Sequence, residues 1–292
     1  ERERGSHDRG DVFERGVRPV VDVGDEGDRG AVDDHRHVGH VGAAMDDEDA
    51  ALARLHRQFG VKAELAAPRI PYRETLTAAS EGQGRHKKQS GGRGQFGDCW
   101  VRFEPLPRGG GFEFGSEIFG GSIPKNFVPA IEKGIVETAA RGFLAGYPMV
   151  DFKAVVYDGS YHDVDSSEMS FKLAARKAFK AAMEVAKPAL LEPVMHVEVQ
   201  APVEYAGDLM GDMNGRRGRV SGMDTKGSTQ IVRAHVPMAE MLNYQNDLTS
   251  MTQGRASFTM EFDHYDYIPS LQADKIIAAA KAAKVGEEEE EE

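Results

Sequence analysis

Cysteines, long apolar runs and a signal sequence are what this chain of 292 residues lacks most clearly. Its one cysteine, Cys99, allows neither an internal disulfide nor a zinc site built from several cysteines. No stretch approaches the roughly 18 consecutive apolar residues of a membrane-spanning helix, and the charged N-terminus has no apolar core of a secretory signal. We therefore expect a cytoplasmic protein with no membrane partner.

The sequence also lacks the motifs of common nucleotide-binding and hydrolytic enzymes. No phosphate-binding loop of the form Gly-x-x-x-x-Gly-Lys-Ser/Thr is present. Gly92, Gly94 and Gly97 match the dinucleotide pattern Gly-x-Gly-x-x-Gly, but a strand is expected after them, where that pattern requires a helix. No serine or cysteine nucleophile is paired with a histidine base. We expect no enzymatic activity, and we assign no cofactor and no metal to this chain.

Basic residues are outnumbered, because 36 Lys and Arg stand against 48 Asp and Glu, for a formal net charge of −12. Six of the acids form a terminal run at residues 287–292, which we interpret as a solvated tail. A nucleic-acid binder that is basic over its whole surface is therefore excluded, but a local basic patch is not.

The first 44 residues contain no Leu, Ile, Lys, Asn, Gln or Thr, and 38 of them are Glu, Arg, Gly, Asp, His or Val. Such a segment cannot build a packed core. It is either a disordered tail or a non-native sequence, such as an upstream region translated in the wrong frame, and its narrow composition favours the second interpretation. Composition bias also explains His35, His37 and His40 better than metal binding does.

From residue 45 onward the pattern predicts folded α+β structure. Residues 45–77 hold a short helix and a strand at 72–78, a piece too small to fold alone. Residues 78–193 are expected to form one α+β domain. Its expected strands are 98–104, 111–118 and 150–157, and its expected helices are 124–143 and 166–186.

Residues 194–267 predict a second α+β domain, in which strands and helices alternate in the βαββαβ order of the ferredoxin-like fold. The expected strands are 194–199, 218–223, 229–236 and 256–262, and the expected helices are 204–213 and 238–251. Residues 268–292 are expected to contain a last helix and the acidic tail. Its predicted buried face is Leu271, Ile276, Ile277 and Ala280.

Residues 83–97 combine glycines with the cations Arg85, Lys87, Lys88 and Arg93. Glycines let backbone amides approach an anion closely, and Lys and Arg attract phosphate without reading sequence. On this segment alone, a plain solvated basic hairpin is an equally good interpretation.

A second candidate loop precedes the helix expected at 166–186. Asp165 as N-cap with Glu168 is expected to form a capping box, which explains both acids without catalysis. His162 lies outside this cap, where no apolar stripe would bury it. An exposed Tyr161 or His162 can hydrogen-bond to RNA or stack on it.

Basic residues elsewhere have plainer explanations. Lys172, Arg176 and Lys180 recur every four residues and fit a solvated helix face, although a helix beside an RNA groove would use the same stripe. A turn at residues 216–219 is also basic, and a plain turn is again the simpler interpretation. The candidate phosphate contacts are Lys87, Lys88, Arg216, Arg217 and Arg219.

Three stretches together resemble the C-terminal half of bacterial translation elongation factor G. They are KQSGGRGQFG at 88–97, DGSYHDVDSSEMSF at 158–171 and GRASFTMEF at 254–262. Residues 120–125 and 190–195 also resemble this family. The resemblance runs from about residue 59 to 284, over the end of domain III, then domains IV and V. It implies a ribosomal S5 domain 2-like βαβ fold for domain IV, followed by a ferredoxin-like domain V.

In that family, domain IV projects as an arm whose tip loops hold the transfer RNA and messenger RNA during translocation. The resemblance places these loops at 89–95 and 159–163, with His162 at the position of the family's tip histidine. The RNA-binding residues that it implies are Gln89, Ser90, Gly91, Gly92, Arg93, Gly94, Gln95, Gly159, Ser160, Tyr161, His162 and Asp163. If both loops leave one end of the same sheet, Arg93 and His162 can touch the same RNA.

The expected partners are the ribosome, ribosomal RNA and the tRNA–mRNA complex, and the expected state is a monomer. The resemblance implies GTP and Mg²⁺ only for a full-length relative with a GTPase domain. Residues 1–44 do not resemble that domain. We therefore expect a truncated or misjoined gene product. Two alternatives stay open: a paralogue acting in ribosome recycling or protection, and a stand-alone RNA-binding module. The second would carry stacking aromatics on its third strand, and residues 229–236 have none.

Overall fold

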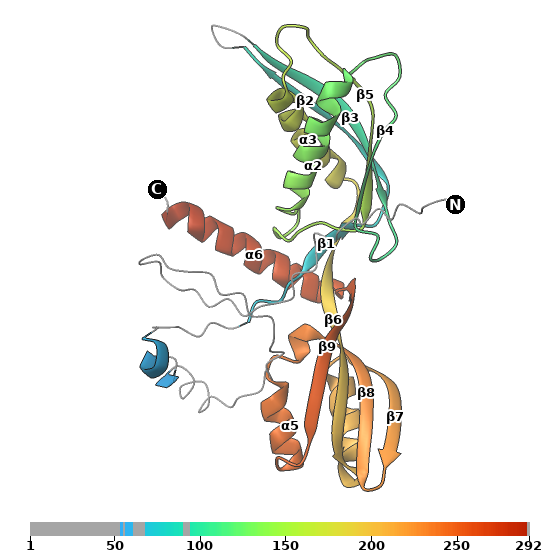
Figure 1. Cartoon of the computed structure of the whole chain (residues 1–292), viewed down its shortest axis with the longest axis vertical. Helices are drawn as coiled ribbons and strands as arrows, with labels where there is room; N and C mark the ends of the chain where they lie inside the picture. The colour runs from blue at the N-terminus through green and yellow to red at the C-terminus, as the bar shows by residue number, and fades with distance from the viewer. Residues whose placement is uncertain (1–52, 55, 61–67, 90–93, 291–292) are drawn as a thin grey trace, which may run out of the picture.

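The computed structural model describes residues 53–54, 56–60, 68–89 and 94–290. Two β-sheets follow one another along the long axis of the molecule (Figure 1). The prediction of disorder for residues 1–44 lies outside the described residues, as do the tip residues Ser90, Gly91, Gly92 and Arg93.

The first sheet has four strands in the order β2-β3-β5-β4, of which β4 and β5 are parallel and the other neighbours antiparallel. Two helices, α2 and α3, pack together on one face of it (Figure 1). The bounds are β2 Ser80–Lys88, β3 Gln95–Pro105, β4 Phe112–Ser116, α2 Val128–Ala139, β5 Phe152–Ser160 and α3 Glu168–Met183.

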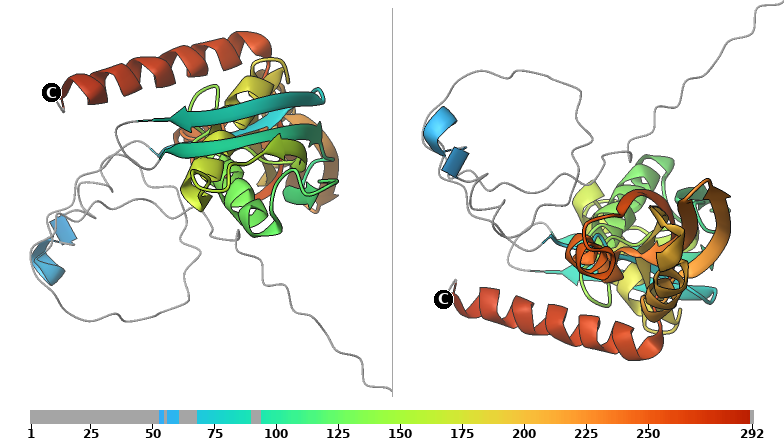
Figure 2. Two further views of the ribbon diagram at one scale, coloured as in Figure 1. Left: turned by 90° about the horizontal axis from the view of Figure 1, so that it is seen from above. Right: turned by 90° about the horizontal axis from the view of Figure 1, so that it is seen from below.

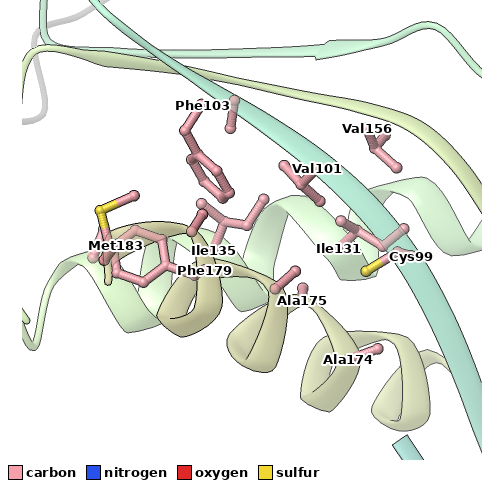
Figure 3. Close-up of a cluster of buried hydrophobic side chains, with 14 of the residues drawn as sticks. Cys99, Val101, Phe103, Ile131, Ile135, Val156, Ala174, Ala175, Phe179 and Met183 are labelled. Atoms are coloured by element: carbon pink, nitrogen blue, oxygen red, sulfur yellow. The ribbon is translucent and has the colours of Figure 1, made fainter. Parts of the chain in front are cut away.

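The core of this unit lies between the sheet and the helices. Alternate residues of β3, Cys99, Val101 and Phe103, are fully buried, and they meet a stripe of α3 that is rich in alanine, including Ala174 and Ala175 (Figure 3). Small side chains on α3 let the helix approach the sheet closely. The predicted half-buried strand at 98–104 is confirmed within the longer β3.

Two glycines of β2 serve the same close packing. A Cβ on Gly84 would overlap the carbonyl oxygen of Ala174, and a Cβ on Gly82 would overlap that of Ala178. Residues 80–88 therefore form a strand whose inward glycines touch α3 and whose outward residues are polar. At both positions the structural reason for glycine is contact with the helix. Gly84 is the one that belongs to the stretch 83–97, and it packs on α3 instead of forming part of an anion-binding loop.

The second sheet has the order β1-β6-β8-β7, with β9 also paired to β6. The sequence of elements β6, α4, β7, β8, α5 and β9 is the predicted βαββαβ order. The bounds are β1 Arg73–Leu76, β6 Pro188–Pro202, α4 Ala206–Gly215, β7 Arg219–Lys226, β8 Thr229–Pro237, α5 Tyr244–Thr252 and β9 Ser257–Tyr267. The helix predicted from 238 begins only at Tyr244, after a short 3-10 turn at Met238–Glu240.

Glu74 on β1 joins the two sheets. Its carboxylate is completely buried and accepts hydrogen bonds from five consecutive backbone amides, residues 143–147, at 2.5–3.1 Å. β1 itself pairs with the start of β6. A single side chain on the second sheet therefore fixes the loop that follows α2, and its buried charge is satisfied by hydrogen bonds.

The last helix, α6 (Ser270–Glu290), lies along one side of the molecule and runs outward beyond it (Figure 2). Its first half packs through Ala273, Ile276, Ile277 and Ala280 on a cluster near the junction of the sheets. Leu271 is 71% exposed, so its predicted burial is wrong. At about 100° per residue, Leu271 lies roughly 140° around the helix from Ile276, off the buried stripe.

Candidate nucleic-acid interface

Strand register brings the two predicted tip loops to the same end of the first sheet. In the β2–β3 hairpin the last pair is Lys88 with Gln95, and the start of β3 pairs with the end of β5, where Asp98 faces Ser160. The end of β2, the start of β3 and the end of β5 therefore lie at the same end of the sheet (Figure 1). The predicted shared end is confirmed for the described parts of both loops, whereas the distance from Arg93 to His162 stays a prediction.

Direct hydrogen bonds join these loops. The backbone amide of Gly94 donates to Asp165 Oδ1 at 3.1 Å, and the amide of Phe96 donates to the carbonyl of Asp165 at 2.9 Å. The hydroxyl of Ser166 donates to the carbonyl of Phe96 at 3.0 Å. A Cβ at Gly94 would lie only 2.8 Å from the Asp165 carboxyl carbon, so a larger residue there would require the Asp165 side chain to shift.

The cap of α3 differs from the prediction. Ser167 is the N-cap, and its hydroxyl accepts a hydrogen bond from the amide of Ser170 at 3.2 Å. The predicted capping box of Asp165 and Glu168 is wrong, because the carboxylate and carbonyl of Asp165 accept hydrogen bonds from Gly94 and Phe96 and the N-cap lies two residues later, at Ser167. Glu168 is the first residue of the helix, where its negative charge favours the helix N-terminus.

His162 is held by its own loop and still presents one edge to solvent. Its Nδ1 accepts from the amides of Val164 and Asp165 at 3.3 Å each, which places the proton of the neutral ring on Nε2. The backbone of His162 exchanges hydrogen bonds with Ser166, at 2.9 and 3.0 Å. The side chain is 59% exposed, so its Nε2–H is available as an oriented donor.

The other described tip residues add polar groups around this donor. Tyr161 and Asp163 are exposed, Gly159 and Ser160 are half-buried at the end of β5, and the hydroxyl of Ser160 donates to Asp98 at 2.9 Å. In the hairpin, Gln89 and Gln95 are exposed, and Gln95 Oε1 lies 2.9 Å from His86 Nε2.

Exposed cations continue from this end along β2. Arg85, Lys87 and Lys88 are all exposed, and the guanidinium of Arg85 lies 5.7 Å from the centre of the Phe96 ring. Cations beside an aromatic ring, an oriented imidazole and an exposed tyrosine are groups that bind phosphates and stack on bases. The tip therefore has the chemistry of a contact with single-stranded or looped RNA.

Arg216 and Arg217, by contrast, use their donors within the second sheet's domain. Arg216 pairs with Asp212 at 2.9 Å and Asp247 at 2.6 Å, while Arg217 binds Glu192 through two nitrogens at 2.7 and 2.9 Å. These ion pairs favour the plain structural turn over a phosphate contact at both positions. Arg219 is exposed.

Other chemistry is limited in the part of the chain that the structure describes. It holds no group of three or more His, Cys, Asp or Glu side chains placed to bind a metal ion. It also contains no helix with the length and apolarity needed to cross a membrane. Cys99 is buried, which raises the pKa of its thiol to about 12, so this thiol is unreactive in the folded protein.

Comparison with known families agrees with this architecture. Residues 68–187 match the model of elongation factor G, domain IV, and residues 189–276 match that of the elongation factor G C-terminus. The two α+β domains are thus those of a translation elongation factor. The chain belongs to the elongation factor G family, with domain IV followed by the C-terminal domain V. The two matches meet at Pro188, where β6 begins.

A crystal structure of a protein from Thermus thermophilus has a similar fold, with a TM-score of 0.72 and 45% sequence identity. The match covers 80% of the present chain and 35% of the Thermus chain. The present chain therefore spans about a third of the length of that protein.

Proposed function

We propose that this chain docks on the ribosome and binds RNA as the C-terminal part of an elongation factor G-type protein. The tip formed by residues 89–95 and 159–163 contacts the tRNA–mRNA complex and promotes its translocation when a GTPase domain is present. The observation that carries this proposal is the joining of two loops, through Gly94 and Asp165, beside an exposed His162. We further propose that the chain is a cytoplasmic monomer and hydrolyses no GTP by itself.

The chemistry of the tip suits a task of holding RNA rather than transforming it. Lys87, Lys88 and the neighbouring cations supply attraction to phosphates, which positions the arm without reading sequence. The Nε2–H of His162 and the ring of Tyr161 supply a directed donor and a stacking surface for an exposed base. Because Nδ1 is fixed by two backbone amides, the donor direction is set before RNA binds.

A pair of substitutions at His162 tests this proposal. His162→Ala removes both ring nitrogens, whereas His162→Asn retains an oxygen that can accept from the amides of residues 164 and 165 but removes the Nε2–H. We expect both variants to bind programmed ribosomes roughly tenfold more weakly, since each loses a directed hydrogen bond. Binding is measured by sedimentation of the full 292-residue chain with ribosomes.

The matched control is His264→Ala, which removes an exposed histidine from β9 in the other domain. Equal binding by the wild type and both His162 variants, with unchanged circular dichroism, would contradict a role for this tip. Placed in a full-length relative with its GTPase domain, His162→Ala should slow translocation and leave GTP hydrolysis largely intact.

A further inference from the structure

A charged hollow lies beside α3, outside the tip loops. It is a groove of about 580 Å³ between β2, the end of α2 and the exposed face of α3. We call it the α3 groove, and its charged or titratable lining residues are His86, Glu137, Arg141, Arg176, Lys177 and Lys180. The tip proposed above uses none of these residues.

The α3 groove carries excess positive charge on a chain whose net charge is −12. Its one acid, Glu137, is already paired with Lys172 at 2.6 Å and Arg176 at 2.7 Å. These contacts lower the pKa of Glu137 and keep it ionised, and the hydrogen bond from Lys172 has the largest effect. Its charge is therefore compensated inside the protein and does not cancel the remaining cations.

The remaining cations face solvent. Lys177 is exposed and donates to the carbonyl of Arg85 at 3.0 Å, an uncharged partner that leaves its positive charge uncompensated. Arg141 and Lys180 are exposed, and neither side chain forms an ion pair with the described residues. A concave surface with uncompensated cations attracts a polyanion, and the attraction is strengthened by the shape of the groove.

The spacing of the cations fits a strand of phosphates. Arg176, which shares the single negative charge of Glu137 with Lys172, and Lys180 are one turn apart on α3, which corresponds to about 6 Å along the helix axis. This separation is comparable to that of successive phosphates along an RNA strand. Phe143 and Leu173 add half-buried apolar surface to the same groove, where a ribose can lie.

The α3 groove is also continuous in the chain with the tip. His86 on its rim precedes Lys87 and Lys88, which lead into the hairpin loop on the edge strand β2. We propose that the α3 groove binds the sugar–phosphate backbone of RNA that continues from the RNA held at the tip. The choice of RNA as the polyanion rests on the proposed function.

The test uses the double variant Arg141→Gln with Lys180→Gln in the full chain. The probe is a fluorescein-labelled RNA hairpin, titrated at several salt concentrations. We expect the affinity to fall roughly tenfold and the slope of log K against log[salt] to lose about 1.4–1.8 units, because two phosphate contacts disappear. The matched control, Lys275→Gln with Lys281→Gln on α6, removes the same charge from exposed positions and should leave the slope unchanged.

Two outcomes would overturn this proposal. The first is an unchanged affinity and salt slope for the RNA hairpin, or no hairpin binding by the wild type. The second is weaker binding to ribosomes without weaker binding to the hairpin, which would indicate an acidic protein as the partner. Ribosome binding by the wild type is measured separately, so that failure of the proposed function is distinguished from failure of the groove.

Discussion

The carboxylate of Asp165 accepts a hydrogen bond from the backbone amide of Gly94 at 3.1 Å, although 71 positions separate the two residues. The backbone carbonyl of Asp165 binds the start of β3 in the same hairpin through the amide of Phe96. One residue thus ties the loop before α3 to the β2–β3 hairpin through both its side chain and its main chain. The position of His162, three residues earlier, depends on this connection.

Replacing Asp165 by Ala should loosen the tip. The carboxylate is only 21% exposed, and its loss leaves the Gly94 amide without this partner, so we expect unfolding free energy to fall by about 1–3 kcal/mol. Amide exchange should quicken at residues 94 and 162–166 more than elsewhere. Urea unfolding and hydrogen exchange measure the two effects. The control Asp163→Ala changes an exposed acid of the same loop and should stay within about 0.5 kcal/mol.

Much of the fold could be predicted because it depends on local patterns. Cys99, Val101 and Phe103 alternate with polar residues, and this alternation predicts the central strand of the first sheet. The second domain's βαββαβ order follows from separate strand and helix patterns of ordinary length. The shared end of the two tip loops follows from the predicted strands together with the family resemblance.

What could not be predicted depends on partners far away in the sequence. β2 contains glycines and charged residues and has no apolar alternation, because its inward positions are filled by the backbone of α3. The cap of α3 lies at Ser167 because Asp165 is bound to Gly94 in another segment. No local pattern indicates that the Glu74 carboxylate would bind five amides about 70 positions later.

Gly84→Ala should be among the most destabilising single-methyl changes in the first domain. Its Cβ would overlap the Ala174 carbonyl oxygen, so β2 and α3 must separate, at a cost of about 1–3 kcal/mol or more. Gly211→Ala is the matched control, because a Cβ there has nothing within 4 Å and lies within the helix α4. That variant should gain about 0.5–1 kcal/mol. Equal urea midpoints for the two variants would contradict the close contact between β2 and α3.

Cys99 should be protected in the folded protein and should make stability fall at high pH. Burial raises the pKa of the folded thiol to about 12, against about 8.5 in the unfolded chain. The stabilisation is therefore complete below about pH 8.5 and is lost as the pH rises toward 12. A thiol reagent at about pH 8 should react only after unfolding. In Cys99→Ala, the decline of unfolding free energy between about pH 8.5 and 10 should become shallower, whereas rapid modification of the native protein would contradict this burial.

Arg217→Gln distinguishes a structural role from a phosphate contact at the turn before β7. Arg217 makes a two-point ion pair with Glu192, which is almost fully buried, and a further one with Glu240 at 2.9 Å. Glutamine would leave the Glu192 carboxylate buried without its cation. We expect a loss of about 2–4 kcal/mol in unfolding free energy, below the full value for a buried pair because a quarter of the Arg217 side chain is exposed.

The control for Arg217 is Arg219→Gln, two positions later and exposed, which should change stability by no more than about 0.5 kcal/mol. Urea unfolding of both variants is compared with the salt dependence of their binding to the RNA hairpin. A structural Arg217 lowers the unfolding midpoint and leaves the salt slope of the folded protein unchanged, because its guanidinium faces carboxylates rather than solvent. A phosphate-binding Arg217 would give the opposite result, an unchanged midpoint and a slope smaller by about one unit.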